Sequence, residues 1–266
     1  MVLERMIWVK PSFFVKDKDF YKTLVRLSLP AALQSLISLL VLMADNVMVS
    51  RFHAEALAPV SQANSVSTFV TAALSGLGGR AMVLISQYWG KRDYDTIERV
   101  MGIAFRISMT VALVFAVAAT LFPAALMRLY TGDEKLIVEG TTYLRVVGVS
   151  FLFMGVSMMY LNMMRAMERV VLSTATYFIS FITNVILNAF FIFVMHMGVL
   201  GVALATTIAR FVEMAICIVD GRRSRGVRFR MKYLFEKNAL LMKDFIRLAL
   251  PSMGNEIIWG LGFSMY

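Results

Sequence analysis

Residues 170–208 read VVLSTATYFISFITNVILNAFFIFVMHMGVLGVALATTI, and this stretch contains no Asp, Glu, Lys or Arg. A helix needs about 20 mainly apolar residues in a row to cross the hydrocarbon of a bilayer. The stretch is therefore long enough for two crossings. It predicts membrane helices at 170–195 and 199–219, and so an integral membrane protein.

Four more gaps in the charge pattern have a similar size. Only Asp45 is charged between Arg26 and Arg51, and the other gaps hold no charge at all: Glu55 to Arg80, Arg106 to Arg128, and Arg145 to Arg165. Lipid offers the backbone no water, so only helices or closed barrels cross it, and the alternating strands of a barrel are absent. We therefore expect an all-α integral membrane fold with helices at 28–50, 58–88, 103–126 and 143–163, and with a seventh beginning near 247.

The composition agrees with a membrane protein and argues against other classes. Hydrophobic residues make up 59% of the chain and the mean hydropathy is +0.72, whereas soluble domains are roughly 45–50% apolar. The net charge of +10 could suit nucleic acid, but the Lys and Arg residues lie in short loops between apolar runs, so no nucleic-acid partner is expected. The single cysteine, Cys217, excludes an internal disulfide and a two-cysteine zinc site. No signature of nucleophile, base and orienting group appears, so we expect neither an enzyme nor a resident cofactor.

The basic residues also predict an orientation. Segments 1–27, 91–106, 165–169 and 222–247 carry 21 Lys and Arg residues, against 4 in the loops on the opposite side. Cytoplasmic loops carry the excess of basic residues. We expect a multi-pass protein of the plasma (inner) membrane whose N-terminus is cytoplasmic.

A short internal repeat divides the chain. RLSLP at 26–30 returns as RLALP at 247–251, at a spacing that fits a six-helix half plus a linker, and many transporters are built from two related halves. A missing C-terminal lobe is therefore expected, and these 266 residues alone are not expected to transport. The predicted segments are a cytoplasmic amphipathic lead-in at 1–27, an N-terminal six-helix lobe at 28–219, a basic inter-lobe loop at 220–246, and the start of helix seven at 247–266.

Proline and glycine suggest local features of the helices. Pro30 is expected in the first turn of the first helix, where a missing N–H does no harm. Pro123 is expected to bend or end the third helix. Gly76, Gly78 and Gly79 either bend the second helix or let another helix approach closely, and close packing is the favoured interpretation.

Polar residues inside the predicted helices are candidates for function. Asp45 is the only acid in the first helix, and such carboxylates mark proton, sodium or cationic-substrate sites, although Asp45 could instead hydrogen-bond near the outer interface. Asn184 and Asn188 share a helix face. They could ligate a cation or join helices, and the sequence does not decide between these roles. Thr206 and Thr207 could add a hydroxyl, although an intramembrane threonine more often bonds the backbone of its own helix.

Two further features concern charge and cavity character. Arg210 and Glu213 lie one turn apart and are predicted to neutralise each other as an intramembrane ion pair. Arg80 is expected to have an internal partner that the sequence does not identify. The 21 Met and 20 Phe residues suit an adaptable cavity that attracts organic cations. They suit a lipid-facing surface equally well.

Three pairs of motifs together resemble the multidrug and toxic compound extrusion (MATE) transporters. They are RLSLPA at 26–31 with MADNVMV at 43–49, GLGG at 76–79 with ISQYWGKRD at 85–93, and NVILN at 184–188 with GVLGVALAT at 198–206. The resemblance implies a two-lobed, twelve-helix exporter that exchanges Na+ or H+ for organic cations by alternating access. It also implies that Asp45, Asn184, Asn188 and Thr206 form the cation site, a possible Na+ site. Asn188 stands where many relatives have an acid, which lowers the negative charge of that site.

Two other functions remain open. A flippase for lipid-linked oligosaccharide or polysaccharide precursors belongs to the same superfamily and would be expected to carry more basic residues inside the lobe. A membrane remnant that does not transport is the third possibility. Efflux of organic cations is the leading interpretation.

The predicted orientation can be tested with single cysteines in a Cys217→Ala variant of the protein expressed from its complete reading frame. We expect Ser12→Cys and Ser224→Cys to react with a membrane-impermeant maleimide only after the cells are permeabilised, because the positive-inside bias places both segments in the cytoplasm. Thr131→Cys, in a loop predicted on the other side, is the control that should react in intact cells. Labelling of Ser12→Cys in intact cells would contradict the orientation.

Overall fold

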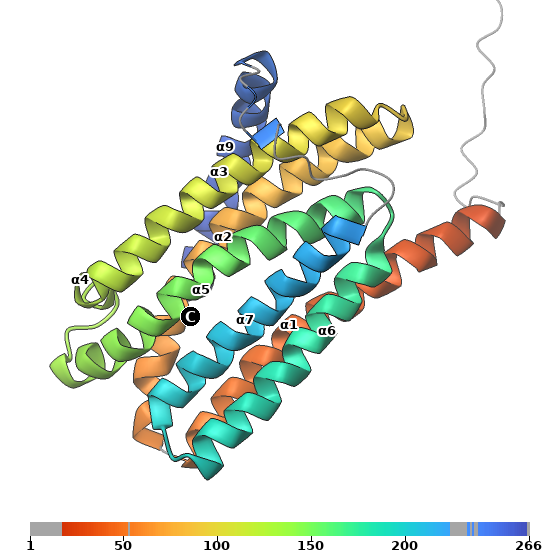
Figure 1. The fold of residues 1–266 in the computed structure, drawn as a ribbon. Coiled ribbons are helices and arrows are strands. Elements are labelled where there is room, and N and C mark those ends of the chain that lie inside the picture. The colour runs from red at the N-terminus through yellow and green to blue at the C-terminus, as the bar shows by residue number, and fades with distance from the viewer. Residues whose placement is uncertain (1–17, 53, 224–232, 235, 237–238, 265–266) are drawn as a thin grey trace, which may run out of the picture.

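The computed structural model describes residues 18–264, except for residues 53, 224–232, 235 and 237–238. Within these residues the chain is helical and contains no strand (Figure 1). Among the described residues, six helical segments are long and apolar enough to cross a membrane, as the charge gaps predicted. The helices that contain them are α1 (Lys18–Phe52), α2 (Ala54–Gly90), α3 (Tyr94–Leu121), α5 (Glu134–Ala166), α6 (Val170–Ala189) with the short π-helix η1 (Phe190–Val194), and α7 (Gly198–Arg223).

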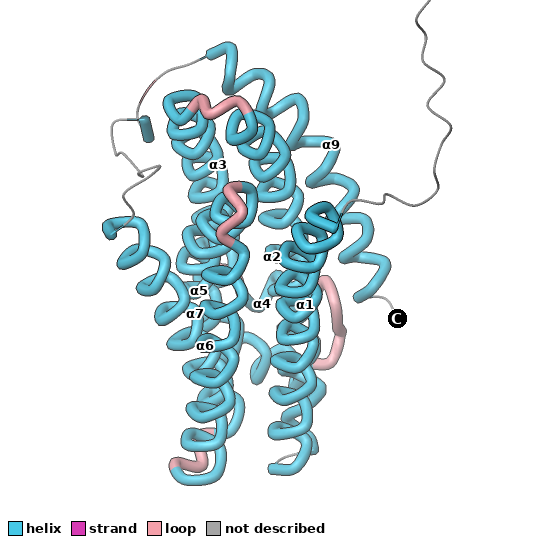
Figure 2. The backbone as a smooth tube through the Cα atoms, turned by 90° about the vertical axis from the view of Figure 1, so that its right-hand side faces the viewer, coloured by secondary structure: helices cyan, strands magenta, loops and turns pink. Residues whose placement is uncertain are grey.

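The six helices form one bundle around α5. Helix α5 packs against α2, α3 and α7, and α6 packs against α1 and α7 (Figure 1). The expected seventh helix is α9 (Ala239–Ser264), which runs along α2 (Figure 2). The all-α membrane fold is thereby confirmed.

The predicted starts of the first and seventh helices are wrong. Residues 18–27 already belong to α1, and residues 239–246 already belong to α9. Pro30 therefore lies inside α1 rather than in its first turn. The charge gaps failed here because they mark the part of a helix that needs an apolar surface. The backbone hydrogen bonds of the helix continue beyond that part.

Helices α3 and α5 also begin earlier than predicted, and each begins at an aspartate cap. The Asp93 carboxylate accepts hydrogen bonds from the Thr96 backbone N–H at 3.1 Å and from Thr96 Oγ1 at 2.7 Å. These bonds lower the pKa of the Asp93 carboxyl below its ordinary value. Asp133 caps α5 in the same way by accepting from the Lys135 N–H at 2.9 Å. Both caps satisfy helix-end N–H groups outside the apolar stretch, which is why the helices extend past it.

Proline ends the third helix as predicted. Helix α3 stops at Leu121, and Pro123 opens the short helix α4 (Pro123–Met127). Proline is well tolerated at the first positions of a helix because its missing N–H has no intrahelical partner there.

Helix α2 continues through Gly76, Gly78 and Gly79, so the cluster does not end the helix, and two of the three glycines serve close packing. A Cβ on Gly76 would lie 2.6 Å from the Met253 Cα of α9, and a Cβ on Gly78 would overlap the Asn162 side chain of α5. Gly79 faces open space, with nothing within 4 Å of an added Cβ. Close approach of α9 to α2 thus depends on Gly76.

The segment between α7 and α9 is fastened to the start of α3. Tyr233 donates a hydrogen bond from its hydroxyl to Asp95 Oδ1 at 2.6 Å. Arg99 forms ion pairs with Asp95 and Glu236, at 2.9 and 2.5 Å. These contacts join the segment between α7 and α9 to the six-helix bundle.

The glycine packing gives a matched pair of stability tests. Gly76→Leu should lower the thermal unfolding midpoint of the purified protein in detergent, because overpacking against a backbone atom costs about 1–3 kcal/mol or more. Gly79→Leu should leave the midpoint unchanged or raise it, because its side chain meets open space and leucine favours a helix over glycine by nearly 1 kcal/mol. Equal midpoints for the two variants would mean that α9 does not depend on Gly76.

Candidate functional site

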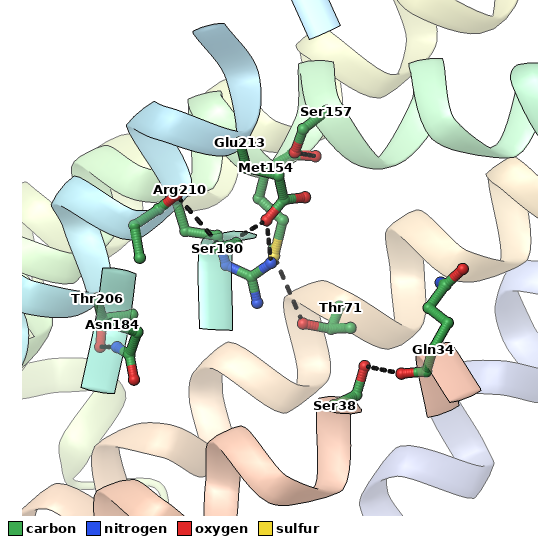
Figure 3. Close-up of polar contacts among 11 residues, drawn as sticks. Gln34, Ser38, Thr71, Met154, Ser157, Ser180, Asn184, Thr206, Arg210 and Glu213 are labelled. Carbon is green, nitrogen blue, oxygen red and sulfur yellow. Dashed lines mark hydrogen bonds and ion pairs between the residues drawn. The ribbon is translucent and has the colours of Figure 1, made fainter. Parts of the chain in front are cut away.

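A cavity of about 460 Å³ lies between α1, α2, α5, α6 and α7. Each of the five helices contributes polar side chains to its wall, including Gln34, Thr71, Ser150, Asn184 and Thr206. Apolar side chains complete the wall, among them Phe151, Met154, Met158 and Phe181. Figure 3 shows how Gln34, Thr71 and Asn184 arrive from three different helices.

Three of the four residues implied as the cation site are joined by hydrogen bonds. Asn188 donates from Nδ2 to Asn184 Oδ1 at 3.2 Å, and Asn184 donates from Nδ2 to Thr206 Oγ1 at 3.4 Å. The two amides share one face of α6 because they are four residues apart. Both are buried, with 3% of Asn184 and none of Asn188 exposed. The link to Thr206 crosses from α6 to α7.

The fourth residue, Asp45, belongs to α1, but its side chain lies outside the described residues. Helix α1 packs against α6 and also contacts α7. The helix that carries Asp45 therefore runs beside both helices that carry the amides and the threonine.

The predicted ion pair is present on α7. Arg210 Nη1 lies 3.0 Å from Glu213 Oε2, one helical turn away (Figure 3). Glu213 is fully buried, and Ser180 of α6 donates to the same carboxylate oxygen at 3.3 Å. Arg210 lines the cavity. A buried acid thus pairs with a basic side chain that lines the cavity.

Arg80 and Thr207 take no part in the cavity wall. The Arg80 side chain is exposed on α2, and the described part of the chain does not supply the internal ion-pair partner that was expected for it. Position 80 is one step past the glycine cluster, on a face that no other described helix covers closely. Thr207 donates to the Ala203 carbonyl of its own helix at 2.8 Å, as intramembrane threonines commonly do.

Sequence reasoning missed Arg165, which it took for a basic loop residue. Arg165 lies in the last turn of α5 and lines the cavity. Its guanidinium donates to Gln34 Oε1 on α1 at 3.3 Å and to the Asn162 Oδ1 one turn earlier. Ser173 of α6 donates to the same Gln34 oxygen at 3.0 Å. The three-residue spacing of Asn162 and Arg165 could have indicated that they contact each other, since residues three apart on a helix are neighbours.

Comparison with known proteins identifies the family to which this chain belongs. A family model described as MatE matches residues 30–190, more than half of the chain. The chain belongs to the MatE family. It is a multi-pass membrane protein of this transporter family, as the motifs indicated.

Individual relatives are distant but cover nearly the whole chain. The uncharacterized transporter YisQ of Bacillus subtilis (strain 168) is 23% identical, over 92% of this chain and 54% of that protein. The multidrug export protein MepA of Staphylococcus haemolyticus (strain JCSC1435) is 21% identical, over 94% of this chain and 55% of that protein. The MatE chain described here therefore spans about half the length of these curated relatives.

Solved structures share the fold. A MATE crystal structure in the bent conformation aligns with a TM-score of 0.81 at 22% identity, covering 88% of this chain and 52% of that one. A multidrug resistance MATE family transporter in an outward-facing conformation aligns with a TM-score of 0.82 at 22% identity, covering 89% and 52%. An inward-facing structure gives a TM-score of 0.77 at 22% identity, covering 90% and 55%.

The buried ion pair can be tested by unfolding. Glu213→Gln should destabilise the purified protein by roughly 3 kcal/mol, because the change removes the carboxylate that faces a partly desolvated guanidinium. The value is at the low end for breaking a buried pair, since the Arg210 side chain is 31% exposed. The measurement is chemical unfolding in micelles. Glu139→Gln, at an exposed acid of α5, is the control. Equal stability of the two variants would contradict a stabilising role for the pair.

Proposed function

We propose that this protein acts in a cation-coupled antiporter that exports organic cations, including drugs, across the plasma membrane by alternating access. In this proposal the six-helix bundle supplies the coupling site and part of the substrate cavity. The observation that carries the proposal is the hydrogen-bonded chain of Asn188, Asn184 and Thr206 inside the bundle, in which both amides are buried while Asn184 and Thr206 line the cavity. Membrane proteins keep such expensive polar clusters inside the bundle mainly at ion and substrate pathways.

The chemistry of the cluster suits a small cation. Amide and hydroxyl oxygens are hard ligands for Na+, and the Asp45 carboxylate would supply the negative charge that either Na+ or H+ requires. Asn188 contributes an oxygen but no charge, so the site would carry one acid. A single acid favours a proton, or weak Na+ binding, over tight Na+ binding.

The cavity suits an amphiphilic substrate. Its volume of about 460 Å³ lies within the range of small-molecule sites. Methionine side chains such as Met154 repack around ligands of different shape, and aromatic rings such as Phe151 and Phe181 attract organic cations. Relatives named for multidrug export support the same substrate class.

Coupling follows if ion and substrate stabilise different conformations. A ligand shifts a conformational equilibrium only by its differential affinity for the two states. In the proposed cycle the ion stabilises one orientation of the lobes and the substrate the other. The transmembrane ion gradient then drives export.

A flippase for lipid-linked oligosaccharide precursors is the second candidate. It is favoured by one observation, the two arginines that line the cavity, Arg165 and Arg210. Efflux of a fluorescent organic cation from vesicles, against translocation of a diphosphate-linked lipid, would separate the two functions.

The coupling role of Asp45 is tested by Asp45→Asn in the protein expressed from its complete reading frame. Efflux of an organic cation driven by a Na+ or H+ gradient should be lost, because an amide neither binds a proton at neutral pH nor carries charge. Asn188→Asp should lower the Na+ concentration for half-maximal efflux by about tenfold, because the second carboxylate adds charge to the site.

Asp133→Asn is the matched control for these variants. Its carboxylate caps α5 outside the bilayer, and asparagine caps helices equally well. Undiminished, gradient-dependent efflux by Asp45→Asn, at a membrane abundance equal to that of Asp133→Asn, would remove Asp45 from the mechanism.

A further inference from the structure

Arg165 is a cavity-lining cation whose described partners are all neutral. Its guanidinium donates to the side-chain oxygens of Gln34 and Asn162. Its Nε–H is buried and has no hydrogen-bond partner among the described residues. Within the same residues it forms no ion pair, whereas Arg169 pairs with Asp220 and Arg210 pairs with Glu213.

The described wall of the cavity is therefore positively charged. Arg165 and Arg210 are the charged side chains among the described lining residues, and none of these residues is acidic. Glu213, which is not among the lining residues, forms an ion pair with Arg210 and neutralises its charge. This leaves the charge of Arg165 uncompensated by the described part of the chain. The Nε–H of this partly buried guanidinium is itself buried without a partner in that part of the chain, and an unpaired buried donor is costly, so its retention points to a ligand of opposite sign.

A purely structural role for Arg165 explains less. A cation in the last turn of a helix interacts favourably with the helix dipole and can anchor the topology. Arg169, four residues later and outside α5, already supplies a basic residue between α5 and α6, where it forms a bidentate ion pair with Asp220 at 2.8 and 3.0 Å. The topology role also gives no reason for Arg165 to face the cavity.

We propose that Arg165 recognises the carboxylate of an amphiphilic substrate, so that the cavity prefers zwitterions to simple organic cations. This inference rests on the proposed function and specifies its substrate class. Guanidinium groups bind carboxylates through two parallel N–H donors, and an arginine with an unpaired Nε–H has a donor to offer once its side chain turns. The apolar part of the substrate would lie along Met154, Met158 and Phe151, which line the same cavity.

The test uses two forms of one dye with the protein purified from its complete reading frame. One form is a fluorescent rhodamine with a free carboxylate, which is a zwitterion, and the other is its methyl ester, which is a cation. Binding is measured by fluorescence anisotropy in neutral detergent without an ion gradient. We expect the wild-type protein to bind the zwitterion about tenfold more tightly than the ester, as one charge-assisted hydrogen bond allows.

The variants separate recognition from structure. Arg165→Gln should weaken binding of the zwitterion by about ten- to hundredfold and leave ester binding unchanged. Arg165→Lys, which keeps the charge but not the forked donors, should give an intermediate preference. Arg128→Gln, at an exposed arginine outside the cavity wall, should behave as wild type.

Several outcomes would overturn the proposal. One is that the wild-type protein binds the two dyes with equal affinity. Another is that Arg165→Gln weakens the binding of the zwitterion and of the ester by the same factor. If Arg165→Gln does not fold, the comparison of the wild-type protein with Arg165→Lys decides whether Arg165 recognises the carboxylate. A preference for the zwitterion that is as large in Arg165→Lys as in the wild-type protein would count against recognition by the guanidinium fork. Disappearance of the preference when phosphatidylglycerol is added to the micelles would assign Arg165 to a lipid phosphate instead.

The proposed function fails by a different result. Tight ester binding without ion-driven efflux of the ester would reject coupled export, and it would leave the carboxylate preference to be judged by the binding data alone.

Discussion

Inside a bilayer, a polar group has to find its partner within the protein, because the hydrocarbon offers neither water nor counter-ions. Hydroxyls in the bundle meet this requirement locally, as when Thr176 donates to the Leu172 carbonyl one turn earlier. Amides and charged groups have more donors and acceptors than the backbone of one helix turn satisfies. The side chains of Asn184 and Arg165 therefore reach across to neighbouring helices, and these links fix which helices meet. The arrangement of α1, α5, α6 and α7 around one cavity depends on this constraint.

Small residues provide the complementary half of the architecture. Lipid tails are as apolar as leucine, so helices in a bilayer associate by close contact rather than by a hydrophobic effect. Gly76 lets α9 approach the backbone of α2. A Cβ added to Gly155 of α5 would lie only 2.8 Å from the Ala112 Cβ of α3. Tight contacts of this kind hold the α2, α3 and α5 side of the bundle together. The polar cavity lies between α2 and α5 of this tightly packed part and the helices α1, α6 and α7.

The sequence predicted the features that depend on local spacing. Charge gaps gave the six crossings, a three-residue spacing gave the Arg210 and Glu213 pair, and a four-residue spacing put Asn184 and Asn188 on one face. Helix ends were not predictable in this way, since helical hydrogen bonds continue beyond the apolar stretch that a gap marks. Arg165 was missed for another reason. Its contact with Gln34 spans 131 positions in the chain, and a contact of that kind depends on how helices pack.

Placing the polar cluster and the arginines in one cavity has a consequence for exchange. Asn184, Thr206, Arg165 and Arg210 all line the same space, so in the proposed antiporter a coupling cation and a substrate would occupy one continuous volume. Like charges a few ångströms apart repel by several kcal/mol at the effective dielectric constant of about 20 that suits protein interiors. A cationic substrate and the coupling ion would therefore exclude each other, which is what antiport requires. A zwitterion would weaken that exclusion unless its carboxylate were held away from the ion site, and a fixed guanidinium at the end of α5 is a means of holding it there.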